Sequence, residues 1–204
     1  MPSATRVVVL LALGYMVTTS PVLAQTRRNL RFGFGLGVAA PQGDFKADAS
    51  GEGFDPGWHT MGYLEFSPSG KPFGLRMEVD FTRNPANQQA KDDIAAEFGP
   101  GFDVSMRTVG ANLNATWNIP LTQRTKGYLL GGIGFATPAF TVSSGGMSAD
   151  TSETNFTWNA GAGLTFPITP VTMFLEFRYF NIANSLEFGP LPFVAVTAGV
   201  RLGH

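Results

Sequence analysis

Charged side chains alternate with apolar ones in several stretches of the sequence. In FLEFRYF (174–180), Glu176 and Arg178 are separated by one residue within a run of large apolar groups, and GLRMEVDF (74–81) repeats this arrangement. Such groups could form ion pairs, line an ion pathway or supply carboxylates for catalysis. If these stretches are extended, their charged side chains share one face. Four basic and four acidic residues are then candidates for such a site: Arg31, Arg76, Arg178 and Arg201 with Glu65, Glu78, Asp80 and Glu176.

Signatures of catalysis and of cofactor binding are weak in this sequence. His59 is the one histidine away from the chain end, and neither GxSxG nor HExxH occurs. Gly35, Gly37 and Ala40 match G-x-G-x-x-A, but a polar loop follows where a dinucleotide site needs a helix. We therefore predict no enzyme, no cofactor and no metal site. A lipid-modifying enzyme is a less favoured alternative, because it needs a nucleophile and a base that face lipid.

The composition excludes several classes of partner and site. Fourteen basic and fifteen acidic residues provide no overall attraction to nucleic acid. The absence of cysteine excludes disulfides and thiolate metal sites. Charged residues make up 14% of the chain, whereas soluble domains usually contain about 25%. The 25 glycines favour strands over helices, because glycine destabilises helix interiors.

Apolar residues recur at every second position, which predicts β-strands. Most of the expected strands are close to the length that a tilted strand needs to cross a bilayer. We expect eight of them, at residues 30–40, 57–67, 73–83, 103–118, 127–137, 155–166, 171–182 and 193–203.

The expected connections alternate between short and long, which is typical of transmembrane barrels. Residues 67–72, 119–126 and 167–170 form short turns, and residues 184–192 form an intermediate one. The long polar loops are 41–56, 84–101 and 138–154, the second with one or two possible helical turns at 91–98.

The two faces of the expected strands differ in character. In 171–181, Val171, Leu175 and Phe177 share an apolar face, whereas Glu176 and Arg178 lie on the other. The second face of most strands is rich in Gly, Thr and Asn, which suits the crowded interior of a narrow barrel. The apolar face would then contact lipid, and the sheet must close because open edges in lipid leave backbone groups unpaired. A secreted soluble barrel, with its apolar face inside, is the alternative.

In two strands the side-chain directions follow less directly from the alternation. Odd positions of 103–118 are expected to face outward, which places Arg107 at the lipid headgroups unless a β-bulge occurs near Met106. In 127–137 we favour Leu129, Ile133 and Phe135 as the outward residues.

An eight-stranded barrel has an interior that side chains can fill. The inward charges are therefore expected to pair and to plug the lumen, because unpaired charges there are costly. A small low-conductance channel gated by these pairs is the alternative. Aromatic residues expected at the membrane interfaces are Trp58, Phe66, Trp117, Phe166 and Tyr179.

The first 24 residues are predicted to be an export signal. Arg6 precedes the apolar run 7–17, and Val22 and Ala24 occupy the small-residue positions before a cleavage site. Residues 25–204 would then form the mature barrel domain.

Three segments resemble the last three strands of small bacterial outer-membrane β-barrel proteins, the OmpA/OmpX-like barrel superfamily: NFTWNAGAGLTFPI (155–168), FLEFRYF (174–180) and FVAVTAGVRL (193–202). The resemblance implies that both termini lie in the periplasm and the long loops outside. It also implies inward roles for Glu176, Arg178 and Arg201, and contact with lipid, lipopolysaccharide and the barrel-assembly machinery.

We therefore expect an all-β, eight-stranded, antiparallel, up-and-down barrel in the outer membrane. The expected role is structural or surface-interacting, with loops 41–56, 84–101 and 138–154 as possible contact surfaces for an extracellular partner.

Overall fold

The structure is a computed structural model that describes residues 29–47, 51–99, 101–144, 147–183 and 189–203. The predicted signal peptide, residues 1–24, lies outside these ranges. None of the helices in the described ranges is long and apolar enough to cross a membrane.

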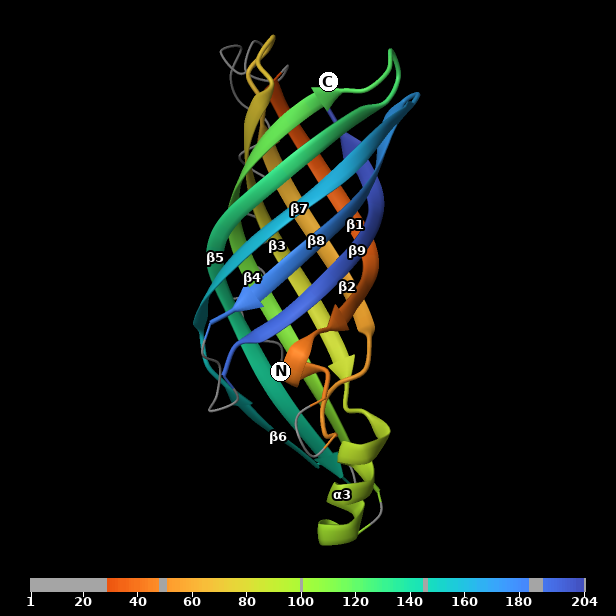
Figure 1. The fold of residues 1–204 in the computed structure, drawn as a ribbon, viewed down its shortest axis with the longest axis vertical. Helices are drawn as coiled ribbons and strands as arrows, with labels where there is room; N and C mark the ends of the chain where they lie inside the picture. Colours follow the sequence, from red (N-terminus) through yellow and green to blue (C-terminus); the bar gives the residue numbers. More distant parts are fainter. Residues whose placement is uncertain (1–28, 48–50, 100, 145–146, 184–188, 204) are drawn as a thin grey trace, which may run out of the picture.

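The described chain is built almost entirely from antiparallel strands (Figure 1). Their bounds are β1 Leu30–Pro41, β2 Gly57–Phe66, β3 Phe73–Pro85, β4 Phe102–Pro120, β5 Lys126–Ser144, β6 Met147–Ser152, β7 Asn155–Ile168, β8 Val171–Ile182 and β9 Leu191–Leu202. A short 3₁₀ helix, η2, spans Gly43–Phe45, and one α-helix, α3, spans Gln88–Phe98.

Eight of these strands close into a barrel, as predicted. The hydrogen-bonded order is β4-β3-β2-β1-β9-β8-β7-β5, and the additional pairing of β4 with β5 joins the two edges. Closure gives every barrel strand a partner on both sides, which removes the unpaired edges that lipid would not tolerate. The remaining strand, β6, is not part of the barrel. It pairs with β5 from Ala139↔Ser152 to Ser144↔Met147 and extends beyond the barrel wall.

Strands β4 and β5 are longer than predicted, and part of the expected loop 138–154 is a β-hairpin. Both strands contain 19 residues and pair along their whole length, from Phe102↔Ser144 to Pro120↔Lys126. The extension was missed because its residues are mostly polar or small, without the apolar alternation that marks the rest of the barrel. Backbone pairing requires no such alternation once a strand leaves the membrane.

The expected loop 84–101 contains a longer helix than the one or two turns predicted at 91–98. Helix α3 starts after Asn87, whose side-chain oxygen accepts a hydrogen bond from the Ala90 amide at 2.9 Å. Gln88 donates to Asp92 at 2.8 Å, one turn further along the helix. The Asn cap and this i,i+4 pair account for the additional first turn.

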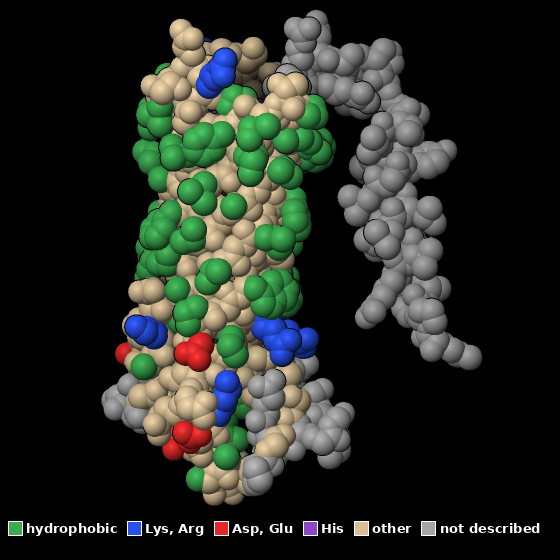
Figure 2. Space-filling view, turned by 90° about the vertical axis from the view of Figure 1, so that its right-hand side faces the viewer, with side chains coloured by type: hydrophobic (Ala, Val, Ile, Leu, Met, Phe, Trp, Pro, Cys, Tyr) green, Lys and Arg blue, Asp and Glu red, His purple; other side chains and the backbone are tan. Residues whose placement is uncertain are grey.

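The apolar side chains face outward, as the alternation predicts. Val79 is 59% exposed and Phe135 63%, whereas the neighbouring Glu78 is 3% exposed. Figure 2 shows a broad apolar zone along the barrel wall, with charged side chains confined to the two ends. A secreted soluble barrel would need the opposite arrangement, so this alternative is wrong.

Arg107 faces outward, and the pairing around it is continuous. On β3, Arg83 and Asn84 lie opposite Arg107 and Met106 without an inserted residue, so the alternative of a bulge near Met106 is wrong. Leu129, Ile133 and Phe135 are all exposed, which confirms the preferred direction in β5.

Candidate functional site

The two ends of the barrel differ. The β2–β3, β4–β5 and β7–β8 connections are short and lie at the end where β9 finishes, which we call the short-turn end (Figure 1). Helix α3 and β6 lie at the opposite end, which we call the long-loop end. Between the two ends, the interior side chains form successive layers along the lumen.

A layer of ion pairs crosses the lumen between β2, β3 and β8. The guanidinium of Arg76 donates to Glu65 Oε2 at 3.0 Å and to Glu176 Oε2 at 2.7 Å. Glu65 also accepts from Arg31 at 3.1 Å. Arg76 and Glu176 are 100 residues apart in sequence and lie on opposite sides of the barrel. Their contact therefore bridges the lumen.

Arg178 extends this layer. Its guanidinium binds both carboxylate oxygens of Glu78, one of them at 2.8 Å, and also pairs with Glu176. Arg76, Glu78, Glu176 and Arg178 are each at most 3% exposed. Buried charges of this kind persist only when paired and hydrogen-bonded, which bidentate contacts to guanidinium groups achieve.

Two tyrosines, Tyr63 and Tyr128, complete the layer. Only charged residues were predicted there from the sequence. Tyr128 donates to Glu176 Oε2 at 2.8 Å, and the Tyr63 ring lies 4.0 Å below the Arg76 guanidinium carbon. Each ring covers a glycine of a neighbouring strand, and a Cβ on Gly33 would collide with the Tyr63 ring. Tyr63 shares the inward alternation of Glu65, and this signal could have identified it.

Two of the eight predicted interior charges, Asp80 and Arg201, lie outside this network. Asp80 accepts a hydrogen bond from Asn112 Nδ2 at 3.1 Å, and Arg201 lies near the short-turn end. Neither forms an ion pair with another residue in the described ranges. Contrary to expectation, Arg201 does not pair with Glu176 or Glu78, because its place on β9 is level with Gly33 and Thr172.

An apolar cluster fills the lumen between the ion pairs and the long-loop end. The rings of Phe180 and Phe193 stack at 4.8 Å, and Met106, Ile182 and Leu191 pack in the same cluster. All five side chains are buried. The lumen is therefore obstructed twice, once by charged pairs and once by apolar side chains.

His59 faces the interior and not the lipid. Its Nδ1 lies 3.0 Å from Thr82 Oγ1, and its ring lies 6.0 Å from that of Phe180. The side chain is 1% exposed. His59 therefore cannot supply the lipid-facing base that a lipid-modifying enzyme needs. In the part of the chain that the structure describes, no group of three or more His, Cys, Asp or Glu side chains could hold a metal ion.

The five predicted belt residues all belong to the outward face. Phe66, Trp117 and Phe166 lie close to the short turns, whereas Trp58 and Tyr179 lie toward the long-loop end. Trp58 stacks on Phe81 at 4.9 Å, and Tyr179 lies 5.5 Å from Trp158. Two levels of aromatic side chains therefore flank the apolar wall.

A pocket of about 520 Å³ opens among the elements of the long-loop end. Its walls include Phe45, Phe54 and Phe140, with neighbouring rings 5.4 and 5.6 Å apart. Asp44 and Glu52 also line it, so an apolar surface carries carboxylates at its edge. All three predicted contact loops contribute residues to this pocket.

Comparison with known proteins supports the same architecture. A sequence model of the outer membrane protein beta-barrel domain matches residues 9–200. Neisserial surface protein A (NspA) superposes with a TM-score of 0.59 at 19% identity, covering 86% of this chain and 97% of that chain. A major outer membrane protein from Thermus thermophilus gives a TM-score of 0.55 at 12% identity, covering 85% and 99%. At these identities the two structures establish the shared fold. The search among curated proteins found no match.

Proposed function

Given that the chain belongs to the outer membrane protein beta-barrel family and lies in the bacterial cell outer membrane, we propose that it is a non-enzymatic surface-interaction protein. The barrel anchors it, and the long-loop end faces outward to meet an extracellular partner. The observation that carries this proposal is the convergence of loops 41–56, 84–101 and 138–154 on one pocket. Binding surfaces commonly consist of loops held by a rigid scaffold.

Hydrogen bonds between the loops support this proposal. The Asn87 side chain donates to Gly51 O at 2.8 Å, and the Asn87 amide donates to Gly53 O at 2.9 Å. Asn84 Nδ2 donates to both Ala39 O and Asp55 O, at 3.0 and 2.9 Å. These bonds hold residues 51–55 of the first loop against the start of loop 84–101. A surface ordered before binding loses less conformational entropy when a partner arrives.

The charge of these loops indicates the chemistry of the partner. The three loops together contain nine acidic and two basic residues. Acidic loops with Asp44 and Glu52 beside an apolar pocket complement a basic partner that presents an apolar or aromatic anchor. The acidic loops would steer such a partner, and the ring-lined pocket would retain it.

Lipopolysaccharide is the proposed lateral partner at the same end. Arg83 and Arg107 lie opposite each other on β3 and β4, and both are exposed on the outer wall. The Trp58–Phe81 ring pair lies on the adjoining part of β2 and β3. Guanidinium groups beside an aromatic interface level suit the phosphates of an outer leaflet. The barrel-assembly machinery remains a proposed partner of the last strand, β9.

The pocket provides the direct test of this function. The double variant Phe54→Lys, Phe140→Lys removes the two rings that meet in the pocket and places positive charge there. We expect it to weaken binding of a basic partner by about tenfold or more. Intact cells displaying each protein would be screened against basic peptides, extracellular-matrix proteins and glycans. Ala96→Lys, on the exposed side of α3, adds positive charge without touching the pocket and serves as control. Binding that survives both the double variant and deletion of all three loops would contradict the proposal.

The obstructed lumen supports a closed barrel over a low-conductance channel. We expect planar-bilayer recordings to show no conductance steps for the wild type or for Arg178→Ala. Removing this guanidinium leaves the Phe180–Phe193 cluster in place, and an apolar constriction excludes ions by excluding water. Conductance steps in the wild type that change in Arg178→Ala would instead favour the channel.

A further inference from the structure

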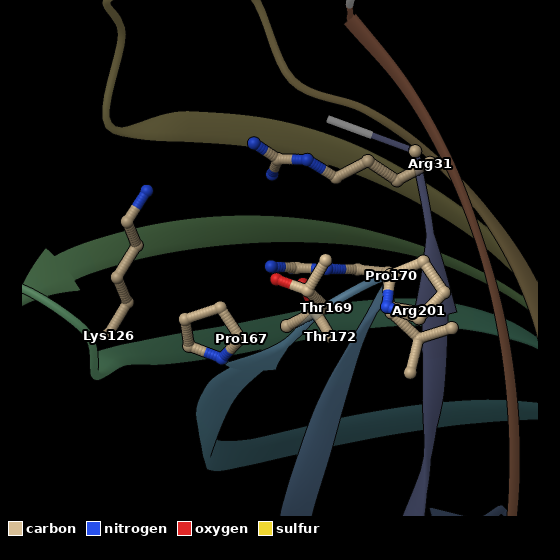
Figure 3. A pocket seen from close by; sticks show the side chains of 9 residues that line it. Arg31, Lys126, Pro167, Thr169, Pro170, Thr172 and Arg201 are labelled. Carbon is tan, nitrogen blue, oxygen red and sulfur yellow. The ribbon is translucent and has the colours of Figure 1, made fainter.

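Three basic residues surround two adjoining cavities at the short-turn end of the barrel. Arg31, Lys126 and Arg201 line both cavities, whose volumes are about 220 and 280 Å³. Thr169 and Thr172 add hydroxyl groups to the first, and Lys71 adds a further ammonium group to the second. Figure 3 shows the first cavity, with the side chains of Arg31, Lys126 and Arg201 arriving from three strands. We call this region the basic vestibule.

The basic vestibule has an excess of positive charge. No Asp or Glu of the described ranges lines either cavity. Glu65 contacts Arg31 of the basic vestibule, and it already forms ion pairs with both Arg31 and Arg76. In the ion-pair network, three carboxylates (Glu65, Glu78 and Glu176) face three guanidinium groups (Arg31, Arg76 and Arg178). The network therefore has no carboxylate to spare for Arg201, Lys126 or Lys71.

The surroundings of Arg201 point to a ligand independently of the excess of positive charge. Its side chain is 7% exposed, although it reaches a cavity. Its Nε has no hydrogen-bond partner within the described residues. On β9 it lies opposite Gly33 of β1 and Thr172 of β8, and neither supplies a compensating charge. A buried cation and an unsatisfied N–H donor both favour an anion beside them.

We propose that the basic vestibule binds a phosphate-type anion. Guanidinium and ammonium groups together with hydroxyl donors form the usual set for phosphoryl oxygens, and Arg presents a planar fork that matches them. Several cations around one space favour a multiply charged anion over a single carboxylate. The phosphoryl group could belong to a phospholipid of the inner leaflet or to a free phosphate compound in the periplasm. Either source would place a ligand site at the end opposite the proposed partner surface.

Binding to the purified, refolded barrel in a phosphate-free maltoside detergent tests this proposal. One arm titrates inorganic phosphate, and a second titrates short-chain phosphatidic acid into the same micelles. The shift of the Arg201 Nε–H resonance and isothermal titration calorimetry report binding. We expect saturable binding in at least one arm, weakened by added salt and reduced about tenfold or more by Arg201→Gln.

Arg124→Gln is the matched control. Arg124 is exposed on a neighbouring short turn and lines neither cavity. We expect this variant to bind like the wild type. If Arg201→Gln fails to fold, as judged by heat-modifiable gel mobility, Lys126→Gln provides the comparison, because Lys126 is exposed and lines both cavities.

The two arms separate the sources of the phosphoryl group. If inorganic phosphate binds and the lipid does not compete with it, the ligand is a free phosphate compound. If only the lipid binds, the ligand is a phospholipid headgroup. No binding in either arm, or equal binding by the vestibule variant and Arg124→Gln, would overturn the inference. Partner binding at the long-loop end does not depend on Arg201, so the two proposals can fail separately.

Discussion

The Arg178→Met variant is expected to lose about 3–5 kcal/mol of unfolding free energy, the usual cost of removing one partner from a buried ion pair. Arg178 holds both oxygens of Glu78 and also pairs with Glu176. Without it, Arg76 is the remaining cation, 4.0 Å from Glu78 and already bound to Glu65. Urea unfolding of the protein in lipid vesicles, followed by tryptophan fluorescence, measures the loss.

Arg124→Met removes the same charge from an exposed turn and controls for net charge. Its effect should remain within about 0.5 kcal/mol, as is usual for surface substitutions. Adding Glu78→Leu to Arg178→Met should recover part of the loss, because replacing both partners by apolar groups avoids an unpaired buried charge. If Arg178→Met and Arg124→Met unfolded at the same urea concentration, the pairs that Arg178 forms would contribute nothing to stability.

The Val79→Arg variant is expected to lose about 2–4 kcal/mol, the cost of an arginine near the bilayer midplane on the lipid face of a barrel. Val79 is 59% exposed and lies near the centre of β3, between Gly62 and Ala111. Placing a guanidinium there requires transfer of a charge into hydrocarbon. The same vesicle unfolding experiment measures the change.

Leu121→Arg makes a comparable apolar-to-charged change in the short turn after β4, where the side chain is 55% exposed. Near the interface this cost falls to about 0–1 kcal/mol. If the two variants were equally stable in vesicles, Val79 would not face lipid. The difference should also shrink in detergent, where the arginine can reach water more easily.

The outermost elements were predicted least well from the sequence. Helix α3 depends on the Asn87 cap, and β6 depends on pairing with the extension of β5. Neither needs a sustained apolar pattern, because these segments lie beyond the barrel wall. The pocket lined by Phe45, Phe54 and Phe140 was likewise not predicted, because its residues come from loops and strand ends far apart in the chain.

The sequence by itself determined that the barrel carries its apolar side chains outside and its charged side chains inside. Alternation is a local property with a period of two residues, so Leu175 and Phe177 could be assigned outward and Glu176 and Arg178 inward from FLEFRYF alone. The tertiary structure decided which inward residues meet. Contacts across the lumen, such as that of Arg76 with Glu176, depend on how strand pairing sets the level of each residue around a closed sheet. The same levels leave Arg201 outside the network, near the short-turn end.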